Sequence, residues 1–400
     1  LLSKDRKHYY PAGRHWAVVA STLKALIPVW REYRALKETA YQNPVDMQGR
    51  IAMAVEVDSE RIDRQIALLA ELGPVPVWVR FYHHKSPAHR ESTAAAIHRL
   101  HEAGHRVSIA LVQDRAAVKN PVSWQAFAED VLERVGGIVD VVEVGHAINR
   151  VKWGIWDFAE YRELVDAVDR LRSVHPNLTL VGPSVIDFEY PYIFAALDGL
   201  PSGTTLGALS HHLYVDRRGA PENPQGPFAA LEKFALARAI ARWSQRCEDR
   251  LIVSEVNWPI LGTGVHSPVG SPYVSPGPRF GDPSVSEDDY ADFMVRYLLI
   301  ALCSGMVEQV CWWRLVAYGF GLVDDSDPEC WRQRPAFKML KTFLVRVGAS
   351  RFESRLELDD QGAVAFLFRG VDGATFWVAY TTQASCEVDL PGHDKRVQLS

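Results

Sequence analysis

Cysteine is scarce in this sequence, and no two cysteines form a C-x-x-C pair. The 400 residues contain five, an odd number scattered through the second half: Cys247, Cys303, Cys311, Cys330 and Cys386. This spacing argues against a zinc site and against a complete disulfide framework. It is typical of proteins in a reducing compartment, so we predict a cytoplasmic protein with no bound metal and no cofactor.

Long hydrophobic runs and an excess of positive charge are also missing. No apolar stretch approaches the roughly 18 residues that cross a membrane. The formal net charge is −5 and the pI is near 6.3, without the overall basic character of nucleic-acid-binding proteins. We therefore predict no nucleic-acid partner. With 48% hydrophobic and 23% charged residues, the composition is that of an ordinary globular protein.

The first part of the chain, residues 1–48, departs from this charge balance. Residues 1–50 carry nine Lys or Arg against four Asp or Glu, and 15–39 has helical spacing. A basic helix can touch an anionic membrane surface. A solvated helix packed on the rest of the protein explains the same pattern, and we expect the second arrangement.

From residue 51 the sequence alternates between short apolar or β-branched runs and longer segments with helical spacing. The predicted strands are 51–57, 75–82, 107–113, 139–145, 178–183, 206–214, 251–257 and 307–315. Helices are predicted to begin near Ser59, Pro87, Ser123, Asp157, Pro191, Pro227, Ser286 and Pro335. Eight such units indicate a (β/α)8 TIM barrel over residues 49–346. The rival is a doubly wound open sheet, which normally carries a glycine-rich loop after its first strand, and 57–60 contains no glycine.

Two further regions stand apart from the alternation. After Gly348 the pattern has a period of two, with Gly- and Asp-containing turns, so residues 347–400 are predicted to form a small antiparallel β appendage. The segment 259–283 is rich in Pro and Gly and follows the seventh predicted strand. A loop of that length at the catalytic face of a barrel suits a lid or a substrate wall.

Reactive residues of barrel enzymes sit at the C-terminal ends of the strands. Besides Glu255, the candidates there are Arg80, His146, Asn149, Arg150, His211, Tyr214, Trp258, Trp312 and Arg314, which we predict to bind substrate. Indole rings stack on the apolar faces of sugars, although a large core also uses them. His211 and His212 are not expected to bind zinc, because no second His or carboxylate cluster stands at helical i, i+4 spacing.

Three segments together resemble the clan A retaining glycoside hydrolases. Residues 252–259 (IVSEVNWP) are similar to the clan's strand-7 motif and 210–214 (SHHLY) to its strand-6 motif. Residues 321–324 (GLVD), followed by 334–337 (RPAF), resemble the segment into helix 8 of xylosidase- and iduronidase-like members. The similarity covers roughly residues 50 to 345. It implies a glycosidase with Glu255 as nucleophile, Tyr214 tuning it, and His211 and Asn149 as positioning groups beside it.

The fourth predicted strand departs from the clan pattern Glu-x-x-Asn-Glu-Pro-Asn. Glu143 and Asn149 match its ends, but His146, Ala147 and Ile148 replace Asn, the acid/base Glu and Pro. Ala147 cannot protonate a leaving group, and whether it is natural or engineered stays open. Glu143 would lie about 13 Å lower along the strand, where it would pair with Arg80. Three other residues could protonate the leaving group, namely Asp187, Glu189 and His146. The fourth alternative is a leaving group that needs little protonation.

Cations also gather at the strand ends: Arg80, Lys85, Arg150, Lys152, Arg217, Arg218 and Arg314. Arginine binds carboxylate or phosphate through paired hydrogen bonds, so an acidic glycan is one hypothesis for the substrate. The first interpretation is an enzyme that acts on a polysaccharide or glycoconjugate. The alternatives are a non-catalytic carbohydrate-binding pseudoenzyme on the same barrel, and a metal-dependent aldolase or lyase.

Overall fold

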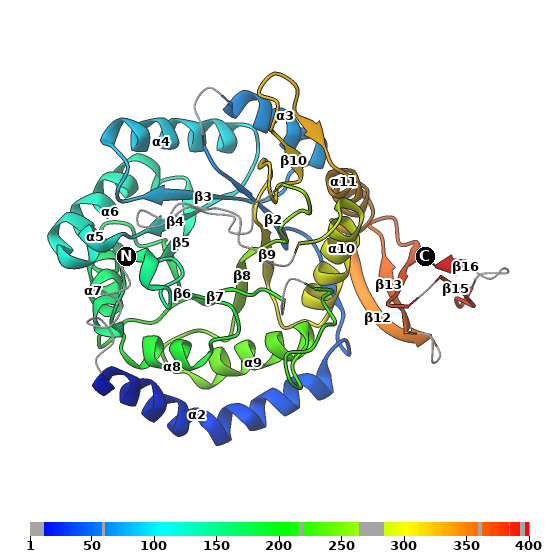
Figure 1. Ribbon diagram of the computed structural model, residues 1–400, viewed down its shortest axis with the longest axis horizontal. Coiled ribbons are helices and arrows are strands. Elements are labelled where there is room, and N and C mark those ends of the chain that lie inside the picture. Colours follow the sequence, from blue (N-terminus) through cyan, green and yellow to red (C-terminus); the bar gives the residue numbers. More distant parts are fainter. Residues whose placement is uncertain are drawn as a thin grey trace.

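The computed structural model describes residues 12–57, 61–215, 219–263, 284–358, 362–383, 385–392 and 397–399. At its centre eight parallel strands close into a barrel in chain order, ringed by helices (Figure 1). The strands are β2 (Ile51–Val55), β3 (Val77–Tyr82), β4 (Val107–Val112), β5 (Val139–Val144), β6 (Thr179–Ile186), β7 (Ala208–His212), β8 (Leu251–Val256) and β9 (Gln309–Trp312). The predicted TIM barrel is confirmed.

The helices cover the outside of the barrel. They are α3 (Ile62–Leu72), α4 (Pro87–Glu102), α5 (Arg115–Lys119), α6 (Pro121–Val135), α7 (Phe158–Asp169), α8 (Pro191–Asp198), α9 (Ala230–Trp243), α10 (Glu287–Cys303) and α11 (Pro335–Val347), with short 3-10 turns at Val151–Trp153 and Arg170–Ser173. Proline opens α4, α8 and α11 as predicted, because its missing N–H needs no partner in the first turn. Ser286 caps α10 by accepting a hydrogen bond from the amide of Asp289.

Side chains of alternate strand residues fill the barrel. Ala54 of β2, Trp78 of β3, Ala208 of β7 and Ile252 of β8 belong to one small apolar cluster. Their neighbours in the strands instead join the main core between barrel and helices. The period of two therefore decides which side chains face the interior, and above this apolar layer the interior becomes polar.

The N-terminal and C-terminal segments lie on the outside of the barrel. Helix α2 (Ala12–Thr39) runs along α8 and α9 (Figure 1). No helix among the described residues is long and apolar enough to cross a membrane. A four-stranded antiparallel sheet has the order β1 (Val45–Asp46), β12 (Arg351–Leu358), β13 (Ala363–Arg369), β14 (Thr375–Thr381). The predicted β appendage is thus present, completed by the pair β15 (Cys386–Val388) and β16 (Val397–Leu399) and by the unpredicted β1. A further two-stranded pair, β10 (Val323–Asp324) and β11 (Arg332–Gln333), follows the barrel strands.

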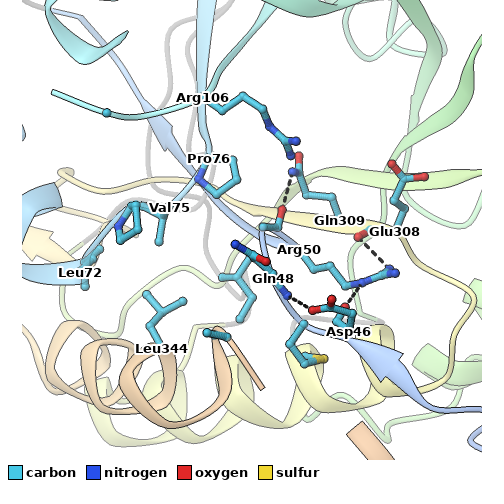
Figure 2. A pocket seen from close by; sticks show the side chains of 17 residues that line it. Asp46, Gln48, Arg50, Leu72, Val75, Pro76, Arg106, Glu308, Gln309 and Leu344 are labelled. Atoms are coloured by element: carbon cyan, nitrogen blue, oxygen red, sulfur yellow. Dashed lines mark hydrogen bonds between the residues drawn. The ribbon is translucent and has the colours of Figure 1, made fainter. Parts of the chain in front are cut away.

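A cavity of about 790 Å³ lies at the base of the barrel, where the strands begin. Figure 2 shows Arg50 and Gln309 on one side of this cavity, hydrogen-bonded to neighbouring chain segments. The Arg50 guanidinium donates to the carbonyls of Val307 and Glu308, at 3.3 and 3.2 Å. Gln309 donates to the carbonyl of Gly49 at 3.0 Å and accepts from the indole N–H of Trp78 at 2.7 Å. Arg50 and Gln309 therefore make these hydrogen bonds with the protein itself and not with a ligand in the cavity.

Candidate active site

An irregularity in β8 presents Glu255 to the barrel interior. Val253 pairs with Val310 of β9, but Val256 pairs with Trp312, so three steps of β8 face two of β9. Such an extra residue is a β-bulge, which re-aims side chains. Ser254 and Glu255 are consecutive residues, yet both are buried and both interact with groups of the barrel interior.

Two donors hold the carboxylate of Glu255. The Arg80 guanidinium donates to Oε2 and the Tyr214 hydroxyl donates to Oε1. Glu255 is 3% exposed, and burial alone would raise its pKa. The positive charge of Arg80 and the electrostatic influence of the His212 ring, with the two hydrogen bonds, outweigh burial and lower the pKa of Glu255 to about 2. The carboxylate is therefore ionised at neutral pH.

Two histidines also lie at the end of the barrel where the strands terminate, which we call the mouth. They are His146, which follows β5, and His212, which ends β7. His212 Nε2 lies 3.7 Å from Oε2 of Glu143, and the rings of His212 and His146 are 4.7 Å apart between centroids. Burial would raise the pKa of Glu143, but its polar contact with the His212 ring lowers it. Burial, with the charges of Arg80 and His212, lowers the pKa of His146 well below its usual value. His146 is therefore a neutral ring at pH 7 and a poor proton donor.

Ala147, at the position that aligns with the clan's acid/base glutamate, is fully buried. Its backbone has φ of 42°, in the left-handed region, and its side chain packs with Tyr82, Val112 and Trp153. The position that aligns with the clan's acid/base glutamate thus belongs to a small apolar cluster.

The neighbours of Glu255 differ from those expected. His211 lies on the outer face of β7, where Nε2 bonds the carbonyl of Asp187 at 3.0 Å and the ring packs on Tyr190. Asn149 bonds the backbone of Ile186 in both directions at 3.0 Å. We expected His211 and Asn149 beside Glu255; the residues that the structure places there are Arg80, His146, His212 and Tyr214.

The period of two explains the change from His211 to His212. Side chains two residues apart share a face of a strand, and Tyr214, which bonds Glu255, is two residues after His212. That parity is visible in the sequence and could have identified His212. Glu143 was expected to pair with Arg80. Instead, Arg80 forms an ion pair with Glu255, and Glu143 contacts His212.

The arginines at the strand ends are matched by carboxylates of the protein. Arg150 bonds Asp187 and Glu189, each at 2.7 Å. Arg314 is paired with Glu56, and Arg80 with Glu255. The anionic-substrate hypothesis therefore loses the support of these three cations. Arg217 and Arg218, and most of the predicted lid at 264–283, lie outside the described residues.

The tryptophans divide between the core and the barrel interior. Trp258 and Trp312 are fully buried and stacked on one another, with centroids 5.6 Å apart, in the main core. The structure thus places both of these predicted sugar contacts away from the barrel interior. Trp313, one residue further, faces the interior, and the Arg80 guanidinium lies 3.4 Å over its ring.

Comparisons with known proteins bear on the fold. No protein-family model matches the chain, and no curated protein matches it. Among solved structures, virulence factor SghA of Agrobacterium tumefaciens matches with a TM-score of 0.50 at 12% identity, over 77% of this chain and 98% of that one. The GH53 catalytic domain of Ignisphaera aggregans matches with a TM-score of 0.50 at 12% identity, over 74% and 98%.

A third match is a variant of Saccharomyces cerevisiae Gas2p in complex with laminaritetraose and laminaripentaose. Its TM-score is 0.50 at 12% identity, over 76% of this chain and 64% of Gas2p. These likenesses agree with the TIM-barrel fold of the chain. At 12% identity the likeness shows the fold alone.

Proposed function

We propose that the chain is a glycoside hydrolase of the retaining type, with Glu255 as its nucleophile. The observation that carries this proposal is the ionised carboxylate of Glu255, held at the polar mouth by Arg80 and Tyr214. A low pKa keeps a carboxylate available to attack, and two fixed donors hold it in one orientation. The oligosaccharides in the Gas2p complex support a glycan as the substrate.

In the proposed first step an oxygen of Glu255 attacks the anomeric carbon. The bond from that carbon to the leaving oxygen breaks, and a covalent glycosyl ester forms. Water then displaces Glu255 from the sugar and restores the carboxylate. Tyr214 and Arg80 would stabilise the carboxylate before attack and after release, which lowers the barrier to the second step.

The first step also raises the question of which group protonates the leaving oxygen. Retaining enzymes place a second carboxyl about 5–5.5 Å from the nucleophile. Ala147 has none, and the candidates Asp187 and Glu189 are engaged by Arg150. We therefore infer that natural substrates have leaving groups that depart with little protonation, such as a phosphate or an acidic sugar hydroxyl.

Aryl glycosides with good leaving groups test the nucleophile without needing an acid. We expect the 400-residue chain to hydrolyse at least one member of a broad panel, and Glu255→Gln to lower kcat/KM by about 10³-fold or more. Glu133→Gln, at an exposed position of α6, is the matched control and should leave the rate unchanged. Azide should restore turnover to Glu255→Gly and yield a glycosyl azide of inverted configuration. A structural role for Glu255 would give no such product.

The pseudoenzyme alternative has its own support in Ala147, whose side chain packs in an apolar cluster. It predicts no turnover of any aryl glycoside by the unmutated chain. It also predicts that oligosaccharides still bind, which a change in tryptophan fluorescence would report because Trp313 faces the interior. Binding without turnover would replace the hydrolase proposal.

A further inference from the structure

Three side chains at the mouth, among them the proposed nucleophile Glu255, form a set of metal-ligand type. His146 follows β5, His212 ends β7 and Glu255 lies in β8. One ligand atom from each lies within 4.8 Å of the other two. All three residues are at most 3% exposed. The sequence did not predict the set, because its members come from three strands and have no regular spacing.

One buried nitrogen of each histidine lacks a partner. Within the described part of the chain, Nδ1 of His146 and Nδ1 of His212 make no hydrogen bond, whereas Nε2 of His212 lies 3.7 Å from Glu143. Buried polar atoms are nearly always partnered, so an unpartnered group needs an explanation such as a ligand. An unprotonated imidazole nitrogen is the form that binds metal.

The surroundings also suit a metal. Glu143 lies 3.7 Å from one nitrogen of His212. A carboxylate behind a ligating histidine orients the ring and raises its basicity. Arg80 and Tyr214 each bond one oxygen of Glu255, and each carboxylate oxygen has a second lone pair that can bind a cation.

We propose that His146, His212 and Glu255 bind a single divalent transition-metal ion, for which zinc is the best match. Two imidazoles and one carboxylate suit zinc, whereas magnesium and calcium prefer oxygen ligands throughout. Ligand atoms around tetrahedral zinc are about 3.3 Å apart, so the three side chains would close inward on binding. The fourth position would face the open mouth.

The metal and the proposed hydrolysis compete for Glu255. A carboxylate that coordinates zinc cannot attack an anomeric carbon at the same time, so bound zinc would inhibit turnover. The two proposals nevertheless stand separately, because metal binding is measured without any sugar. All ligands must be deprotonated, so the metal affinity falls as the pH is lowered.

The test is a calorimetric titration of the chelator-treated 400-residue chain with Zn²⁺ at pH 7.5. We expect one equivalent to bind, His146→Ala to weaken binding more than about 100-fold, and Glu143→Gln to weaken it by about 10- to 100-fold. His101→Ala, at an exposed histidine of α4, is the matched control and should change nothing. Binding equal in His146→Ala and His101→Ala, or no binding at all, would overturn the proposal.

Cobalt gives a second measurement that needs no variant. Co²⁺ in a site of low coordination number absorbs strongly in the visible range, whereas hydrated Co²⁺ absorbs weakly. We expect strong absorption that saturates at one equivalent and is displaced by Zn²⁺. A weak spectrum like that of the hydrated ion would contradict the site. Strong absorption with cobalt, together with no turnover of any aryl glycoside by the metal-free chain, would sink the hydrolase proposal and leave the metal site standing.

Discussion

The two ends of the barrel treat their buried polar groups in opposite ways. At the base, Arg50 and Gln309 are bonded to backbone carbonyls (Figure 2), and Gln309 also accepts from the indole of Trp78. At the mouth, several buried polar atoms lack partners within the described residues. They belong to His146, His212, Asn257 and Trp313.

This difference indicates where a ligand could bind. A buried polar group without a partner costs about 1–3 kcal/mol of stability, so a protein tolerates a group of them where they serve another purpose. The base closes the barrel, whereas the mouth holds charges and lone pairs in place. A visible cavity is therefore a poorer guide to function here than unpartnered atoms.

The largest effect should come from breaking the ion pair of the mouth. Arg80→Met leaves Glu255 buried without its cation, and we expect the free energy of unfolding at pH 7 to fall by about 3–5 kcal/mol. The double variant Arg80→Met/Glu255→Gln should recover much of this, since it leaves no uncompensated charge. Urea denaturation of the three variants measures both. A double variant as unstable as the sum of the singles would show that the pair is not coupled.

The sequence predicted the barrel because buried parallel strands are continuous apolar runs with helices between them. All eight strands lie within the predicted ranges or overlap them. Helix α5, Arg115–Lys119, was not predicted, since five residues are too few to show a helical period. Strand β1, Val45–Asp46, was not predicted because it exists only through pairing with β12, about 300 residues later.

The site was harder to predict than the fold. Strand ends identified the right neighbourhood, including Arg80, His146, Tyr214 and Glu255. Which of two adjacent residues faces inward depends on parity, and the bulge in β8 shifts the parity at Glu255. Whether Arg150 is free for a substrate depends on carboxylates after another strand. Both require the fold.

A second comparison concerns how the stability of the fold depends on pH, through His211 near the end of β7. Burial and the charge of His212 lower the pKa of His211 to about 3 from an ordinary 6.5. Between these pH values the unfolded chain binds a proton that the folded chain does not, so stability is lost as the pH falls. We expect His211→Gln to reduce the pH dependence by about 1.4 kcal/mol per pH unit between pH 6 and 4.

Urea midpoints across that range provide the measurement, and slopes are compared because the variant also loses a hydrogen bond at every pH. His101→Gln, at an exposed position, is the control and should keep the slope of the unmutated chain. Equal slopes for both variants would mean that His211 is protonated in the folded protein.

At the base, Gln309→Met keeps the shape of the side chain and removes its polar atoms. The buried indole N–H of Trp78 then loses its acceptor. We expect a loss of about 1–3 kcal/mol in the free energy of unfolding, measured by urea denaturation at pH 7. A change within error would show that water or another group can replace the amide, and the base would no longer differ from the mouth.

The matching change at the mouth should have the smallest effect. Asn257 follows β8, is 1% exposed, and has both amide atoms buried without a partner among the described residues. Asn257→Leu removes two unsatisfied groups at nearly constant shape, so we expect the free energy of unfolding to stay within about 1 kcal/mol or to rise. A loss as large as that of Gln309→Met would mean that the amide of Asn257 is already bonded. The contrast between the two ends would then rest on the charged residues alone.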